Sequence, residues 1–207
     1  MKKRTKLLIV PMIFFMLNCA KEKPDLAPDH SVDNQVLKEM YLKDIEIRAL
    51  DERTDTVNLE SFDKVHREKV FELLADNKIV SPNDKYRAAL ILQHTAAKIC
   101  DGEITSISPE NYLLAFHLSQ NAMIKTPNAR DLNIPRMVAL NYDRYLLYSQ
   151  GYQKYGTQLI FDDTNGEMVL APMDTTLATD EERSQYQVEP LRVLLSKHKI
   201  KSLPPSN

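Results

Sequence analysis

Residues 135–171 read PRMVALNYDRYLLYSQGYQKYGTQLIFDDTNGEMVLA, and the spacing of the apolar residues changes inside this stretch. Before Gly151 they recur at the spacing of an amphipathic helix, and a glycine is typical of the position just after a helix. Beyond it, two short runs of β-branched and apolar residues flank Asn165-Gly166, a dipeptide typical of a hairpin turn. The stretch therefore predicts a helix over about 135–150 and one β-hairpin near 157–171.

Apolar residues at helical spacing also predict helices on both sides of this stretch. Ser108-Pro109-Glu110 is a typical helix start, and the run from Tyr86 to Cys100 is the most apolar of the helical segments. The further expected helices span about 36–50, 59–79, 86–100, 109–125, 179–186 and 190–198. We therefore expect a mainly α fold, a compact helical array of about six or seven helices with one β-hairpin, in a single domain over 32–201.

The first nineteen residues have the organisation of an export signal. Four basic residues precede an uncharged run from Leu7 to Asn18, and this run is too short to span a bilayer, for which about 20 residues are needed. We predict a signal peptide over 1–18, a flexible tether over 19–31 and a proline-bearing tail over 202–207.

The end of the uncharged run resembles the lipobox of bacterial lipoproteins, with the cysteine at Cys19. The resemblance implies cleavage before Cys19, acylation of its thiol and anchoring to a lipid bilayer of the bacterial cell envelope. Ala20-Lys21 after the cysteine favours the outer membrane over the inner membrane. An ordinary secreted protein with an incidental cysteine is the alternative.

Composition limits the partners of the chain. Removal of residues 1–18 takes away four basic residues and no acidic ones, which leaves 23 basic and 29 acidic residues. An acidic exported domain is a poor candidate for binding nucleic acid. With Cys19 acylated, Cys100 has no cysteine to pair with, so we expect no disulfide and place Cys100 in the core at a helix end.

Several motifs between residues 86 and 192 resemble an uncharacterised bacterial domain family. These motifs are Gln93-His94, Asp143-Arg144, Gln153-Lys-Tyr-Gly-Thr-Gln158, Pro172-Met-Asp174, the helix that bears Arg183, and Pro190-Leu191. The resemblance implies a candidate site without a known activity. The expected catalytic residues are His94, Asp143 and Arg144. The expected ligand-binding residues are Gln93, Tyr155, Gly156, Thr157, Gln158, Asp174 and Arg183.

His94 lies among apolar residues, so its ring nitrogens need partners. If Asp143 or Asp174 accepts a hydrogen bond from one nitrogen, the other is free for general-base catalysis or a metal. The alternative is a core histidine bonded to a backbone carbonyl or to Gln158.

Arg144 likewise has two possible roles, one in binding a ligand and one in holding the fold together. It could bind a carboxylate or phosphate of a ligand, or bond Asp174 or the carbonyls of the Tyr155-Gly156 turn and so join helix to hairpin. Gly156 is expected to adopt a conformation that other residues resist, or to allow a close approach to a helix.

We expect no metal and no cofactor, because the chain has no His-x-x-x-His or Cys-x-x-Cys pair and no Gly-rich phosphate loop. Three functions stay open. The first is an envelope lipoprotein that binds a small ligand or an envelope protein in a polar groove near the hairpin. The second is a hydrolase-like enzyme with His94 as general base, oriented by Asp143, while Arg144 or Gln158 holds the substrate. The third is a purely structural lipoprotein.

Overall fold

A computed structural model describes residues 32–49, 58–100, 103–164 and 166–201. The described helices and strands are α1 (Gln35–Ala49), α2 (Leu59–Ala75), α3 (Pro82–Gln93), β1 (Ala97–Cys100), β2 (Glu103–Ser106), α4 (Pro109–Lys125), α5 (Ile134–Gln150), β3 (Leu159–Asp162), β4 (Glu167–Leu170), α6 (Asp180–Gln185) and α7 (Leu191–Lys197). The prediction of a mainly α fold with seven helices and a hairpin near 157–171 is confirmed. The predicted signal peptide, Cys19, the tether and the tail lie outside the described residues.

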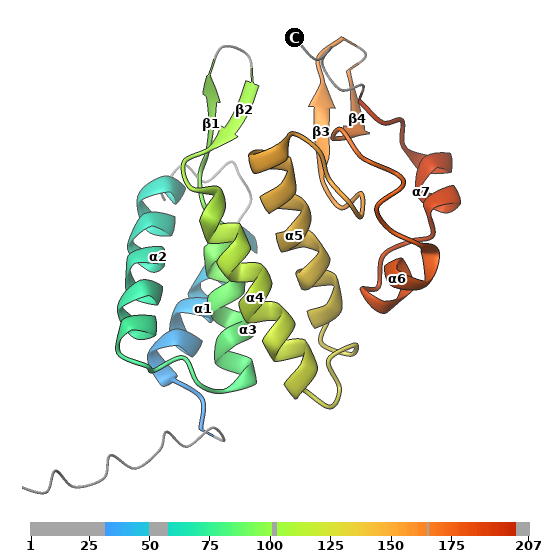
Figure 1. The fold of residues 1–207 in the computed structure, drawn as a ribbon. Helices are drawn as coiled ribbons and strands as arrows, with labels where there is room; N and C mark the ends of the chain where they lie inside the picture. The colour runs from blue at the N-terminus through green and yellow to red at the C-terminus, as the bar shows by residue number, and fades with distance from the viewer. Residues whose placement is uncertain (1–31, 50–57, 101–102, 165, 202–207) are drawn as a thin grey trace, which may run out of the picture.

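The helices form a layered array in which α3, α4 and α5 lie next to one another (Figure 1). α3 contacts α1 and α2 on one side and α4 on the other, and α5 packs against α4. The core between the first four helices contains apolar side chains from each of them and Ile79 from the α2–α3 connection. The helical residues are Leu37, Val70, Leu73, Ala88, Ala89, Ile91, Leu92 and Ala115. Alanines on α3 allow the neighbouring helices to approach closely, as its composition indicates.

The C-terminal part of the chain covers the far side of α5 (Figure 1). β3 and β4 pair antiparallel, from Leu159 opposite Leu170 to Asp162 opposite Glu167. The short helices α6 and α7 complete this part, and Leu170, Met173 and Leu194 form a small apolar cluster below α7. None of the helices among the described residues has both the length and the hydropathy of a membrane span.

The helix predicted over 86–100 is too long. α3 ends at Gln93, and β1 pairs antiparallel with β2 to make a second hairpin, so Cys100 lies in a strand rather than at a helix end. Tertiary contacts explain the early end of the helix. Its last carbonyls bond to arginines from other helices: Arg67 donates to His94 O at 3.0 Å and Arg144 donates to Gln93 O at 2.7 Å.

The N-terminus of α1 is fixed to the N-terminus of α3 by two aspartates. Asp33 accepts from the Ser81 hydroxyl at 2.7 Å and from Arg87 at 2.8 Å, while Asp84 accepts from the backbone N–H of Asn34 at 2.9 Å. These contacts fix the position at which α1 begins, next to the start of α3.

The carboxylate of Asp33 makes the docking of α1 sensitive to acid. Burial acts to raise the pKa of Asp33, but hydrogen bonds from Ser81, Arg87 and Asn83 outweigh burial and hold that pKa below its usual value. A carboxyl with a lowered pKa in the folded state stabilises the fold above its unfolded pKa, and this contribution is lost as the pH falls through the folded pKa.

We expect Asp33→Asn to lower the free energy of unfolding by about 1 kcal/mol near neutral pH, because its hydrogen bonds to charged and hydroxyl donors weaken. The difference from the wild type should shrink as the pH falls through the lowered pKa of the wild-type carboxyl, because that carboxyl then also becomes neutral. Urea unfolding near neutral pH and over a series of acidic pH values measures this, with the exposed Asp131→Asn as control. A difference independent of pH would contradict the role of the charge.

Candidate functional site

The carboxylate of Asp143 is the centre of the contacts that fix segment 153–158. Asp143 lies on α5 and is fully buried. One oxygen accepts from the backbone N–H groups of Lys154 and Tyr155, both at 2.8 Å, and the other accepts from the N–H and hydroxyl of Thr157 at 2.9 and 2.8 Å. Burial raises the pKa of this carboxyl, and the four donors act against that rise. Both oxygens face segment 153–158, so Asp143 holds this segment on α5.

Arg183, on α6, binds the same segment through its carbonyl groups. Its fully buried guanidinium donates to Tyr155 O at 2.8 Å and to Lys154 O at 3.4 Å. The neighbouring Glu182 accepts from the Tyr155 hydroxyl at 2.7 Å and from Lys154 Nζ at 2.8 Å. Burial acts to raise the pKa of Glu182, but these two donors hold it below its usual value. Segment 153–158 is thus fixed by positively and negatively charged side chains.

The two glutamines at the ends of the segment, Gln153 and the predicted site residue Gln158, close it into a loop. Gln153 is fully buried; its amide donates to the carbonyls of Gln158 and Ala171 at 2.9 Å each and accepts from the N–H of Gln158 at 2.8 Å. Arg144 donates to Gln158 Oε1 at 3.2 Å and to Gln93 O at 2.7 Å. Of the two roles open to Arg144, these contacts favour the joining of helix to hairpin.

Gly156 and Asp174 were both expected in the ligand-binding site, but their surroundings differ from each other. Gly156 has a φ of +75°, and a Cβ there would collide with Leu194 Cδ2 and approach Met173 Sδ to 3.2 Å. Both expected reasons for this glycine, the unusual conformation and the close approach, therefore apply. The carboxylate of Asp174 accepts from the N–H and hydroxyl of Thr176 at 2.9 and 2.7 Å, which is a local turn.

His94 lies in a separate cluster at the end of α3. Its Nδ1 is 3.1 Å from Oδ1 of Asp44, a buried residue of α1. Neither Asp143 nor Asp174, the two carboxylates considered as partners, bonds the His94 ring, because Asp143 binds segment 153–158 and Asp174 binds Thr176. Among the described residues no hydrogen bond is made by Nε2 of His94, and the alternative of a histidine bonded to a backbone carbonyl or to Gln158 is also not observed.

The cluster around His94 contains a second carboxylate and a guanidinium. Arg48 Nε lies 3.3 Å from both oxygens of Asp44, and Arg48 Nη2 binds Asp63 Oδ1. Burial acts to raise the pKa of Asp44, but His94 and Arg48 hold it below its usual value, whereas burial leaves the pKa of Asp63 raised. One oxygen each of Asp44 and Asp63 and one nitrogen of His94 lie within 4.8 Å of one another, a donor set that could hold a metal ion.

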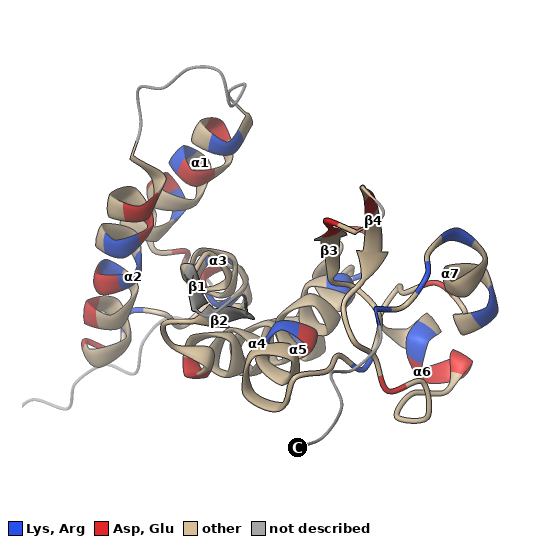
Figure 2. Ribbon diagram, turned by 90° about the horizontal axis from the view of Figure 1, so that it is seen from above, with Lys and Arg blue, Asp and Glu red and all other residues tan. Residues whose placement is uncertain are grey.

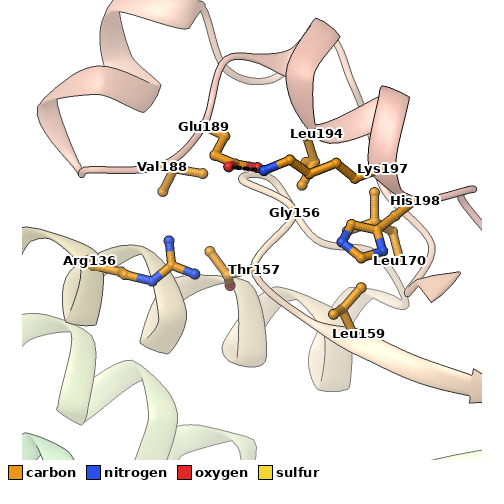
Figure 3. Close-up of a pocket in the computed structure, with 10 residues that line it drawn as sticks. All are labelled: Arg136, Gly156, Thr157, Leu159, Leu170, Val188, Glu189, Leu194, Lys197 and His198. Atoms are coloured by element: carbon orange, nitrogen blue, oxygen red, sulfur yellow. Dashed lines mark hydrogen bonds and ion pairs between the residues drawn. The ribbon is translucent and has the colours of Figure 1, made fainter. Parts of the chain in front are cut away.

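A pocket of about 240 Å³ lies between α5, the turn at Gly156, the β3–β4 hairpin and α7 (Figure 3). Its apolar lining consists of Gly156, Leu159, Leu170, Val188 and Leu194. Its polar lining consists of Arg136, Thr157, Glu189, Lys197 and His198. Two of the ten lining residues, Gly156 and Thr157, are among the predicted ligand-binding residues, and the other predicted residues do not line the pocket.

Of the ionisable residues at these two places, only His94 was among the predicted site residues. Arg136 is a single basic residue on a helix, and Lys197 and His198 match the usual basic end of a helix, so no motif marks them. Asp44 lies on α1, Asp63 on α2 and His94 just after α3, and only the tertiary fold brings them together. The expectation of no metal depended on the absence of paired ligands close in sequence. That absence does not bear on ligands from distant parts of the chain.

Comparison with known proteins gives no relative: no family model, no curated protein and no solved structure matches the chain.

We expect Asp143→Asn to destabilise the fold by about 3 kcal/mol, because an amide nitrogen in place of one oxygen leaves buried N–H donors without an acceptor. Urea unfolding followed by circular dichroism measures the loss. Asp174→Asn is the matched control, since this carboxylate serves only a partly exposed turn, and its effect should stay within about 0.5 kcal/mol. Equal effects of the two changes would contradict the central role of Asp143.

Proposed function

We propose that the protein is a lipid-anchored protein of the bacterial cell envelope whose domain binds a small organic anion in the pocket beside Gly156. The cationic rim of this pocket over an apolar floor carries the proposal. The lipoprotein part is supported by the basic start, the short uncharged run and Cys19, which together resemble a lipoprotein signal.

The charge of the rim favours a ligand with a carboxylate or phosphate group. Arg136 reaches toward Thr157 (Figure 3), and among the described residues its guanidinium makes one hydrogen bond, to Gln187 O at 3.4 Å, although it has five N–H donors. Glu189 pairs with Lys197, and the charge of Arg136 also acts on Glu189, so the lining holds one carboxylate against two permanently basic side chains, Arg136 and Lys197. α7 itself contains two basic residues and no acidic one (Figure 2).

The size and lining of the pocket favour a short ligand with an apolar part. Ligand pockets for drug-sized molecules measure about 300–1,000 Å³, so a cavity of about 240 Å³ suits a smaller molecule. Leu159, Leu170 and Leu194 offer apolar surface next to the basic groups. A short-chain carboxylate combines both properties.

The hydrolase alternative receives less support from the contacts. Asp143 is the residue expected to orient His94, and its oxygens bind segment 153–158 instead. Arg144 and Gln158, the expected substrate contacts, bind each other at 3.2 Å. A structural role without ligand is the outcome if the binding experiment fails.

We expect hexanoate at ten times its dissociation constant to stabilise the purified mature protein by about 1.4 kcal/mol, which raises the melting temperature by about 3–5 °C. Hexanol should stabilise it less and hexylammonium should not stabilise it, because the ligand charge must match Arg136. Differential scanning calorimetry measures the shifts.

Arg136→Gln should abolish the hexanoate shift, while Arg192→Gln, at an exposed position of α7 outside the pocket lining, should leave it unchanged. Equal shifts with hexanoate and hexylammonium, or an unchanged hexanoate shift in Arg136→Gln, would refute the anion pocket.

We expect Cys19→Ser to release the protein from the membrane fraction, because the lipid would have no thiol to attach to. Cell fractionation with immunoblotting measures this. Cys100→Ser is the matched control and should sediment with membranes like the wild type. If Cys19→Ser still sediments, lipidation at this residue is wrong.

A further inference from the structure

Three helices bring metal-binding donors together at one end of the bundle. Asp44 lies on α1, Asp63 on α2 and His94 just after α3, and the ligand atoms of all three lie within 4.8 Å of one another. Asp44 Oδ1 and His94 Nδ1 are 3.1 Å apart. Two ligands of one ion, each at about 2.0–2.2 Å from it, are separated by about 3–4 Å, so these positions are compatible with a shared ion.

From these donors we infer a binding site for one divalent transition-metal ion, with Zn²⁺ as the probe of choice, formed by Asp44, Asp63 and His94. An imidazole nitrogen with two carboxylate oxygens is a donor set that Zn²⁺ accepts. Three protein ligands leave a coordination position open for water or another ligand. The site is separate from the pocket beside Gly156 and does not depend on the proposed anion binding.

Burial of the two carboxylates gives the site its affinity for cations. The side chain of Asp44 is 2% exposed and that of Asp63 is 12% exposed, so both negative charges have lost most of their hydration. A divalent ion neutralises both. Arg67, whose charge also acts on Asp63, is engaged with the carbonyl of His94 and stays in place.

Arg48 is the competing cation at this site. Its guanidinium contacts both carboxylates, and it lies near the end of α1 with its side chain 29% exposed. Because the side chain is long and reaches solvent, it can swing away when an ion binds. Arg48 therefore makes the two interpretations distinguishable: a metal site gains affinity when Arg48 is removed, whereas a structural ion-pair network only loses stability.

His66, near this cluster, has a buried ring nitrogen, Nδ1, without a hydrogen-bond partner among the described residues. It lies one turn after Asp63 on α2, and the charges of Asp44 and Asp63 both act on it. Buried polar groups nearly always have partners. The unpaired Nδ1 of His66 therefore shows that the polar groups around this cluster are not all paired within the described residues.

The test is isothermal titration of Zn²⁺ into the chelator-treated mature protein near neutral pH. We expect one Zn²⁺ per chain, at least a tenfold loss of affinity in Asp63→Asn and His94→Gln, and at least a tenfold gain in Arg48→Gln. His117→Gln, an exposed histidine of α4, and Cys100→Ser are the matched controls and should bind like the wild type.

The gain in Arg48→Gln does not depend on variants that lose a ligand, so it keeps the test valid if Asp63→Asn or His94→Gln fails to fold. Absence of stoichiometric binding in both the wild type and Arg48→Gln would overturn the site. So would a loss of binding in either control equal to that in His94→Gln, because the ion would then bind elsewhere.

Discussion

The buried carboxylate of Asp143 determines where the chain goes after α5. Its two oxygens accept hydrogen bonds directly from the backbone N–H groups of Lys154, Tyr155 and Thr157, in segment 153–158. Such a charge is costly to bury unless it is fully bonded, so the carboxylate and the segment stabilise each other only in this arrangement. The hairpin, α6 and α7 all follow this segment in sequence, and their positions on α5 depend on it.

The same contacts decide which residues are left to bind a ligand. Arg183 donates to carbonyls of the segment, and Gln153 bonds the backbone of Gln158 and Ala171. The Gln158 side chain accepts from Arg144, which also bonds the end of α3. A motif dense in polar residues therefore indicates an internal network at least as well as an active site. The pocket that we propose binds an anion lies instead at the edge of this network, where Gly156 closely approaches α7 and basic side chains contribute to the lining.

Local patterns explain what the sequence could predict. The five long helices follow from apolar spacing, and the β3–β4 hairpin from Asn165-Gly166, because both signals arise between residues close in sequence. The partner of His94 was not predictable, since Asp44 is 50 residues away. The β1–β2 hairpin was missed because the apolar run to Cys100 continues the helix pattern, although Asp101-Gly102 is a hairpin signal that could have revealed it.

The C-terminal end of α3 is bonded to three other helices, α1, α2 and α5. The carbonyl of Gln93 accepts from Arg144 of α5, the carbonyl of the next residue, His94, accepts from Arg67 of α2, and the His94 ring contacts Asp44 of α1. Two guanidinium groups thus complement the negative end of the α3 dipole and satisfy carbonyls that a longer helix would have used. Because adjacent residues carry these contacts, the His94 cluster and the network that supports the pocket are built on the same helix end.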